Sequence, residues 1–150
     1  MRRLGKKIVK DQRGAALVEF AIAATIFLTV TFAVIEFGYL LWIHNALTDA
    51  ARRGARYAVT HAKTDASAVQ NVAVYGDPAG STQPLVNNLT TANVNVQYSP
   101  DFGLNAGRVS VSIQNYQYRF VLPILGTTLN MPAYTTTLTG ENVGLIPPDR

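Results

Sequence analysis

Residues 13–35 read RGAALVEFAIAATIFLTVTFAVI, and this stretch decides the architecture of the chain. From Ala15 to Ile35 it contains one charged residue, Glu19. About 20 consecutive apolar residues suffice to cross the hydrocarbon core of a bilayer. The sequence therefore predicts a membrane-spanning helix near the N-terminus. An acid within such a helix costs roughly 2.5–3.5 kcal/mol at the bilayer centre and less toward the ends, so the presence of Glu19 needs a reason.

The positive charge of the 150-residue chain is concentrated before this run. The formal net charge of +4 divides into +5 for residues 1–14 and −1 for the remainder. A short basic flank stays on the cytoplasmic side of a membrane. This asymmetry predicts a cytoplasmic N-terminus and an extracytoplasmic C-terminal domain. The sequence contains no cysteine, which excludes disulfides and thiolate chemistry.

Three interpretations of the N-terminal segment are open. A secretory signal peptide has an apolar core of about 7–15 residues followed by a small-residue cleavage site. Ala21-Ile22-Ala23 is a weak candidate for that site, but the apolar run continues beyond it. The second interpretation is an uncut membrane anchor. The third follows from a resemblance to a known family.

RGAALVEF resembles the class III signal of type IV pilins and pseudopilins. In that family a basic leader ends in glycine, a prepilin peptidase cuts after it, and the fifth mature residue is glutamate. The resemblance implies a leader over residues 1–14, a cut between Gly14 and Ala15, and Glu19 at mature position five, followed by the aromatic Phe20. The segment VEFAIAATIFLTVTFAVIEFGYLL and the LTDAARRGARYAV that follows are similar to TadE-like pseudopilins of tight-adherence (Tad, Flp-type) pilus systems.

The resemblance also implies a role for Glu19. Cleavage would create an α-amine on Ala15, and an acid four residues further along a helix lies about 6 Å away by axial rise. The two groups could pair within one chain or between subunits. Breaking such a pair in a buried setting costs about 3–5 kcal/mol. The alternative is an interfacial acid whose side chain reaches the headgroups.

The helix is expected to continue outside the membrane, with a spanning segment over residues 15–43 and an amphipathic segment over residues 44–68. Small residues recur at every fourth position of the second segment. Such a row forms a ridge that another backbone can approach closely. The ridge residues are Ala46, Ala50, Gly54 and Ala58.

The charged residues of the helix are expected to be solvated. Glu36 lies about 30 Å from Ala15 by helical rise, which predicts an acid at the outer headgroups. Asp49 is expected to pair with one of the next two bases, since residues three or four apart are neighbours on a helix. The bases predicted to form a solvated face are Arg52, Arg53 and Arg56. The alternative is that they contact an acidic surface on a partner.

Residues 69–150 are expected to form an extracytoplasmic β-rich domain. Alternation of polar and apolar residues is typical of half-buried strands. The predicted strands are 92–98, 108–114, a third strand or a continuation through Tyr116, Tyr118 and Phe120, and 134–139, with a short strand over 72–75 before the turn-rich GDPAGSTQP. The predicted fold class is α+β: a long N-terminal helix packed on a small antiparallel sheet in a pilin-like layout.

Nothing in the sequence predicts catalysis. His44 and His61 stand alone, without the spacing of H-E-x-x-H, and there is no phosphate-binding loop, dinucleotide fingerprint or nucleophile elbow. Both histidines are expected to be structural or solvent-facing. No catalytic residue, metal, cofactor or nucleic-acid partner is therefore expected.

The resemblance implies a non-catalytic, TadE-like minor pseudopilin in a Tad/Flp-type pilus system. The implied partners are a prepilin peptidase, other pilins and pseudopilins of the same system, the Tad assembly machinery of the bacterial inner membrane, and the lipid bilayer. The alternative is an uncut single-span envelope protein whose outer domain is a binding or scaffolding module. The N-terminal residue of the protein in its native membrane distinguishes the two.

Overall fold

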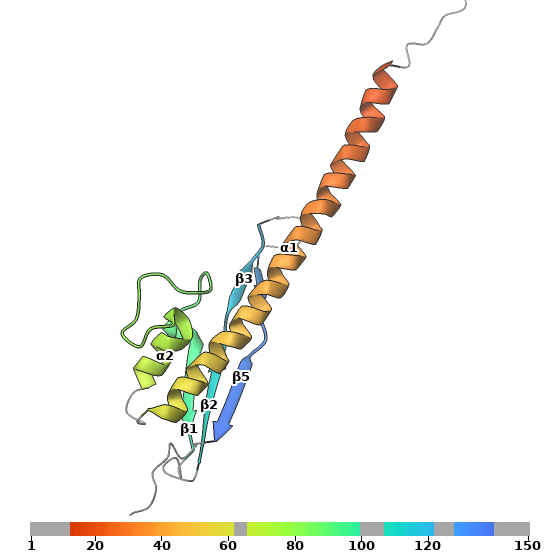
Figure 1. Ribbon diagram of the computed structural model, residues 1–150. Coiled ribbons are helices and arrows are strands. Elements are labelled where there is room, and N and C mark those ends of the chain that lie inside the picture. The colour runs from red at the N-terminus through yellow and green to blue at the C-terminus, as the bar shows by residue number, and fades with distance from the viewer. Residues whose placement is uncertain (1–12, 62–65, 100–106, 122–127, 140–150) are drawn as a thin grey trace, which may run out of the picture.

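The computed structural model describes residues 13–61, 66–99, 107–121 and 128–139. Helix α1 (Arg13–Thr60) is continuous over 48 residues. Its N-terminal half stands clear of the other elements, and its C-terminal half lies across a β-sheet (Figure 1). None of residues 14–35 is buried. One long apolar helix near the N-terminus fits a single-pass membrane protein.

The main sheet has three antiparallel strands in the order β1-β2-β5. These are β1 (Val94–Tyr98), β2 (Arg108–Ile113) and β5 (Tyr134–Thr139). In the register of the sheet, Val111 at the centre of β2 lies opposite Val96 of β1 and Thr136 of β5. The predicted strands over 92–98, 108–114 and 134–139 are confirmed, except that β1 is preceded by a short 3-10 helix, η1 (Thr91–Asn93).

A second, two-stranded sheet pairs β3 (Gln117–Arg119) with β4 (Thr128–Asn130). Asn115 lies between β2 and β3 and has a φ of 57°, in the left-handed region. This kink makes β3 a separate strand and not a continuation of β2. The sequence did not predict β4, whose three residues are too few to show alternation and are all exposed.

Helix α2 (Ala66–Tyr75) packs beside α1, so the predicted strand over 72–75 is wrong. Val69, Val72 and Ala73 are buried at the i, i+3, i+4 spacing of a helix face, which four residues taken alone could not reveal. The helix expected to continue to residue 68 instead ends at Thr60. There the Thr60 hydroxyl and Nδ1 of His61 are 3.0 and 2.9 Å from the carbonyl of Tyr57.

The core lies between the sheet on one side and α1 with α2 on the other. Its largest members are the fully buried aliphatic side chains of the helices, the connecting loop and β2. They are Ile43, Leu47, Val69, Val74, Val86, Leu89, Val109, Val111 and Ile113. This is the predicted α+β arrangement of a long helix on a small antiparallel sheet.

Candidate functional site

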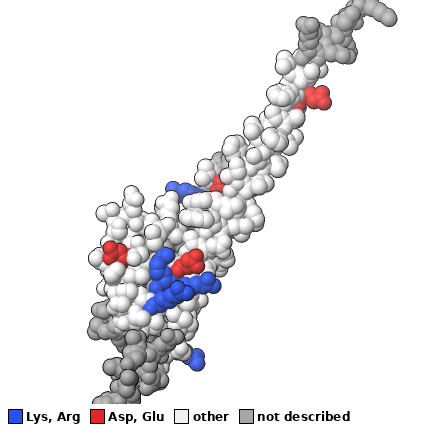
Figure 2. Space-filling view, viewed as in Figure 1, with Lys and Arg blue, Asp and Glu red and all other residues white. Residues whose placement is uncertain are grey.

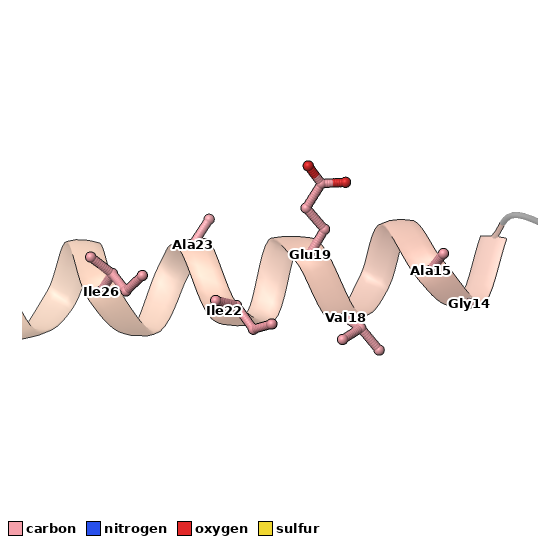
Figure 3. Close-up of a pocket in the computed structure, with 7 residues that line it drawn as sticks. All are labelled: Gly14, Ala15, Val18, Glu19, Ile22, Ala23 and Ile26. Atoms are coloured by element: carbon pink, nitrogen blue, oxygen red, sulfur yellow. The ribbon is translucent and has the colours of Figure 1, made fainter.

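The residues expected to carry processing and assembly lie at the free end of α1. Gly14, Ala15, Glu19 and Phe20 are all exposed, Phe20 at 71% of its surface. Figure 3 shows the side chains of Ala15, Glu19 and Ala23 on one side of the helix, with the Glu19 carboxylate pointing away from it. Within the part of the chain that the structure describes, Glu19 has no hydrogen-bond or ion-pair partner.

The surface around Glu19 is apolar and open. Val18, Ile22 and Ile26 line it together with the small residues drawn in Figure 3. All of these residues come from one helix, and no other element among the described residues closes the surface into a cavity. Exposed apolar surface of this extent marks contact with a membrane or with other protein segments. The arrangement offers an acid to a partner that approaches from outside the chain.

The small-residue ridge packs inside the chain. Ala50, Gly54 and Ala58 are buried, and Ala46 is half-buried. A Cβ added at Gly54 would lie 3.1 Å from the Cβ of Ala73 and 3.2 Å from Cγ1 of Val111. The close approach that small residues permit is therefore made by α2 and β2 of the same chain.

Glu36 is not solvated, so the expectation of a headgroup acid is wrong. Its side chain is only 6% exposed. The oxygen Oε1 accepts a hydrogen bond from the Tyr118 hydroxyl at 2.5 Å and a second from the Val121 backbone N–H at 3.1 Å. Glu36 therefore joins α1 to the end of β3. No sequence pattern links residues that are 82 positions apart, which is why the prediction failed.

Aromatic rings surround this junction. The Tyr118 ring lies 6.0 Å from Tyr39 and contacts Phe120 edge-on at 5.1 Å. Tyr39 in turn stacks on Trp42 at 5.7 Å. Burial raises the pKa of the Tyr118 hydroxyl above its ordinary value of 10.0, and the hydrogen bond to Glu36 and the charge of that carboxylate raise it further. Tyr118 therefore stays a neutral donor to Glu36 at physiological pH.

The arginines of α1 have separate roles. Arg52 pairs with Asp49 at 3.6 Å, as expected, and both side chains are largely exposed. Arg53 is not part of a solvated face: its guanidinium donates to the carbonyls of Val72 and Ala73 at 3.2 and 3.1 Å. These carbonyls belong to the last turn of α2, where a cation offsets the helix dipole. Figure 2 shows charged side chains gathered over the C-terminal half of α1, while the described residues of its projecting N-terminal half are nearly uncharged.

Both histidines make structural contacts. Nδ1 of His44 is 2.9 Å from the Tyr134 hydroxyl, and the two rings meet edge-on at 5.1 Å. His61 stacks on Tyr57 at the end of α1. In the described ranges of the chain, no three His, Cys, Asp or Glu side chains are grouped so that they could hold a metal ion.

Comparison with known proteins supports a family resemblance for the N-terminal part. Searches of curated proteins and of solved structures gave no match to this chain. A family model, however, matches one segment of the chain. This segment begins at the glycine expected to end the leader and includes Glu19, Glu36 and three residues of the small-residue ridge, Ala46, Ala50 and Gly54. Residues 14–56 match the family described as TadE-like protein, which confirms the resemblance to TadE-like proteins of Tad pilus systems in this segment.

Proposed function

We propose that the protein is a TadE-like minor pseudopilin, which a prepilin peptidase cuts between Gly14 and Ala15. The observation that carries this proposal is the exposed Glu19, four residues after Ala15 on a projecting apolar helix. The family match over residues 14–56 supports it. In this proposal the mature protein has a non-catalytic role, and the peptidase performs the cleavage.

The position of the proposed cleavage site suits a peptidase. Gly14 and Ala15 lie in the first turn of α1, where backbone N–H groups have no partner within the helix. Glycine favours the helix by about 1 kcal/mol less than alanine. Unwinding this end to present an extended peptide bond therefore breaks few interactions. The leader would stay in the cytoplasm and the apolar segment in the inner membrane.

The side chain of Ala15, the residue that would carry the new α-amine, lies on the side of the helix that carries Glu19 (Figure 3). An amine and a carboxylate in an apolar setting attract strongly, because low dielectric increases their interaction. Pairing between neighbouring chains would fix their axial register, as polar groups in apolar contacts do. The partners are other pilins and pseudopilins of the same system and the Tad assembly machinery. The folded outer domain favours a minor subunit over the bulk filament.

The first test is the N-terminal sequence of the protein isolated from its native membrane, determined by mass spectrometry. We expect a chain that begins at Ala15. A chain that begins at Met1 would contradict cleavage and favour the uncut single-span envelope protein.

The second test is Glu19→Ala, which we expect to leave insertion and cleavage largely intact and to reduce incorporation into pili. Thr31→Ala is the matched control, because the Thr31 hydroxyl bonds only to the Phe27 carbonyl of its own helix. Normal piliation by the Glu19→Ala protein, with cleavage intact, would refute the pairing role while leaving the processing role in place.

One observation favours the alternative of a binding module. A polar recess of about 300 Å³ lies between the turn before η1 and the β3–β4 sheet. Its lining is rich in amides and includes one guanidinium: Asn88, Asn93, Asn115, Gln117, Arg119 and Thr128. If the N-terminus proves to be uncut, this recess is the candidate binding site of the alternative function.

A further inference from the structure

The projecting part of α1 ends where the outer domain begins. At 1.5 Å per residue the helix from residue 14 to residue 35 is about 33 Å long, close to the roughly 30 Å of a bilayer's hydrocarbon core. The next residue, Glu36, is the first buried residue along α1. The outer boundary of the hydrocarbon therefore coincides with the contact between α1 and the end of β3.

Val121 is held at this boundary. Its backbone N–H donates to Glu36 at 3.1 Å, so its height along α1 is fixed by that hydrogen bond. Its side chain is 79% exposed, more than any other exposed large hydrophobic residue in the described chain. A valine this exposed beside a bilayer surface is placed to contact lipid.

An apolar recess of about 290 Å³ separates Val121 from α1. Phe32, Ile35 and Tyr39 line the helix side, with Glu36 between them. Phe32 and Ile35 are 50% and 61% exposed and belong to the projecting, lipid-facing part of α1. The recess is thus continuous with the surface that the bilayer covers. Tyr39 and Trp42 add the aromatic side chains favoured at membrane interfaces.

We propose that this recess is a lipid-binding surface, in which an acyl chain of the outer leaflet packs between Val121 and α1. The outer domain then contacts the membrane at two places, through α1 and through Val121, which follows β3 in the chain. Glu36 sets the position of the second contact. The proposal rests on membrane insertion of residues 14–35 and does not depend on cleavage or on incorporation into a pilus.

Tryptophan fluorescence tests the proposal, because Trp42 is the single tryptophan of the chain. In a Trp42→Phe background, Val121→Trp is prepared in the full-length chain and reconstituted into phosphatidylcholine vesicles with brominated acyl chains. Phe27→Trp, in the projecting half of α1, reports insertion. Gln97→Trp, on an exposed position of β1, is the control that stays in water.

We expect bromine to quench Val121→Trp and Phe27→Trp strongly and Gln97→Trp hardly at all. Bromines near the headgroup end of the acyl chain should quench Val121→Trp more than deep bromines do. Adding Glu36→Ala removes the acceptor for the Val121 N–H. It should reduce quenching of Val121→Trp and leave that of Phe27→Trp unchanged.

Quenching of Phe27→Trp without quenching of Val121→Trp would overturn the lipid contact while leaving membrane insertion intact. Loss of both signals would overturn insertion and the lipid contact together. If a second copy of the chain fills the recess, Val121→Trp will resist bromine and its emission will shift when the protein is diluted in lipid. That outcome would also refute the proposal.

Discussion

The hydrogen bond between Tyr118 and Glu36 should be a large contributor to the stability of the folded C-terminal domain. Both side chains are buried, at 2% and 6% exposure, and the oxygens are 2.5 Å apart, the distance of a charge-assisted bond. A hydrogen bond to a charged group contributes about 1.5–3 kcal/mol. Glu36→Leu also strands the buried hydroxyl, which costs about 1–3 kcal/mol.

A double-mutant cycle isolates this bond from the other effects of each substitution. Glu36→Leu, Tyr118→Phe and the double variant of the full-length chain are unfolded with urea in mild detergent, and near-ultraviolet circular dichroism follows the folded C-terminal domain. We expect each single variant to be less stable, and the double variant to be destabilised by about 1.5–3 kcal/mol less than the sum. A coupling energy below about 0.5 kcal/mol, the limit for independent sites, would refute the role assigned to this bond.

Three further predictions concern stability in the same urea assay. Gly38→Ala should stabilise α1 by about 1 kcal/mol, since nothing lies within 4 Å of the added carbon. The carbon added by Gly54→Ala meets carbons at 3.1 and 3.2 Å, so this variant should be less stable than the Gly38→Ala variant by about 1–3 kcal/mol. Equal effects of the two substitutions would contradict the close packing at Gly54. Arg53→Met should lower the free energy of unfolding by about 1–3 kcal/mol, because it removes two hydrogen bonds to α2. Arg52→Met loses only an exposed ion pair and should lower it by less than about 1 kcal/mol. The reverse order would refute the role of Arg53 at the end of α2. Because burial raises the folded-state pKa of Tyr118, its neutral form contributes stability below about pH 10 that is lost as pH rises further, and Tyr118→Phe should flatten this alkaline decline.

Local patterns predicted the elements whose signal lies in neighbouring residues. The apolar run of α1 and the alternation of β1, β2 and β5 each extend over enough residues to reveal their period. The strand predicted over 72–75 was wrong because four consecutive apolar residues are equally compatible with a strand and with a helix. Its helical face emerges only with Val69, which lies outside that segment.

The candidate site divides in the same way. Gly14, Ala15 and Glu19 lie close together in sequence, so a motif could nominate them as candidates. Glu36 and Arg53 were assigned to solvent because their partners come from β3 and α2, and only the tertiary fold brings those groups to α1. The residues next to an acid or base on a helix do not reveal a partner that is distant in sequence. Because charged residues are mostly exposed, a solvated side chain is then what the sequence predicts.

The two halves of α1 differ in what they leave available to other molecules. The C-terminal half presents its small residues to α2 and β2, so that its close-packing face is already occupied. Residues 14–35 are not buried by any other element within the described residues. If this chain leaves the bilayer for an assembly of protein subunits, the apolar side chains of residues 14–35 lose their contacts with acyl chains and gain contacts with neighbouring helices. The solubility of an intermediate extracted from the bilayer then depends on how completely the helices replace the lipid.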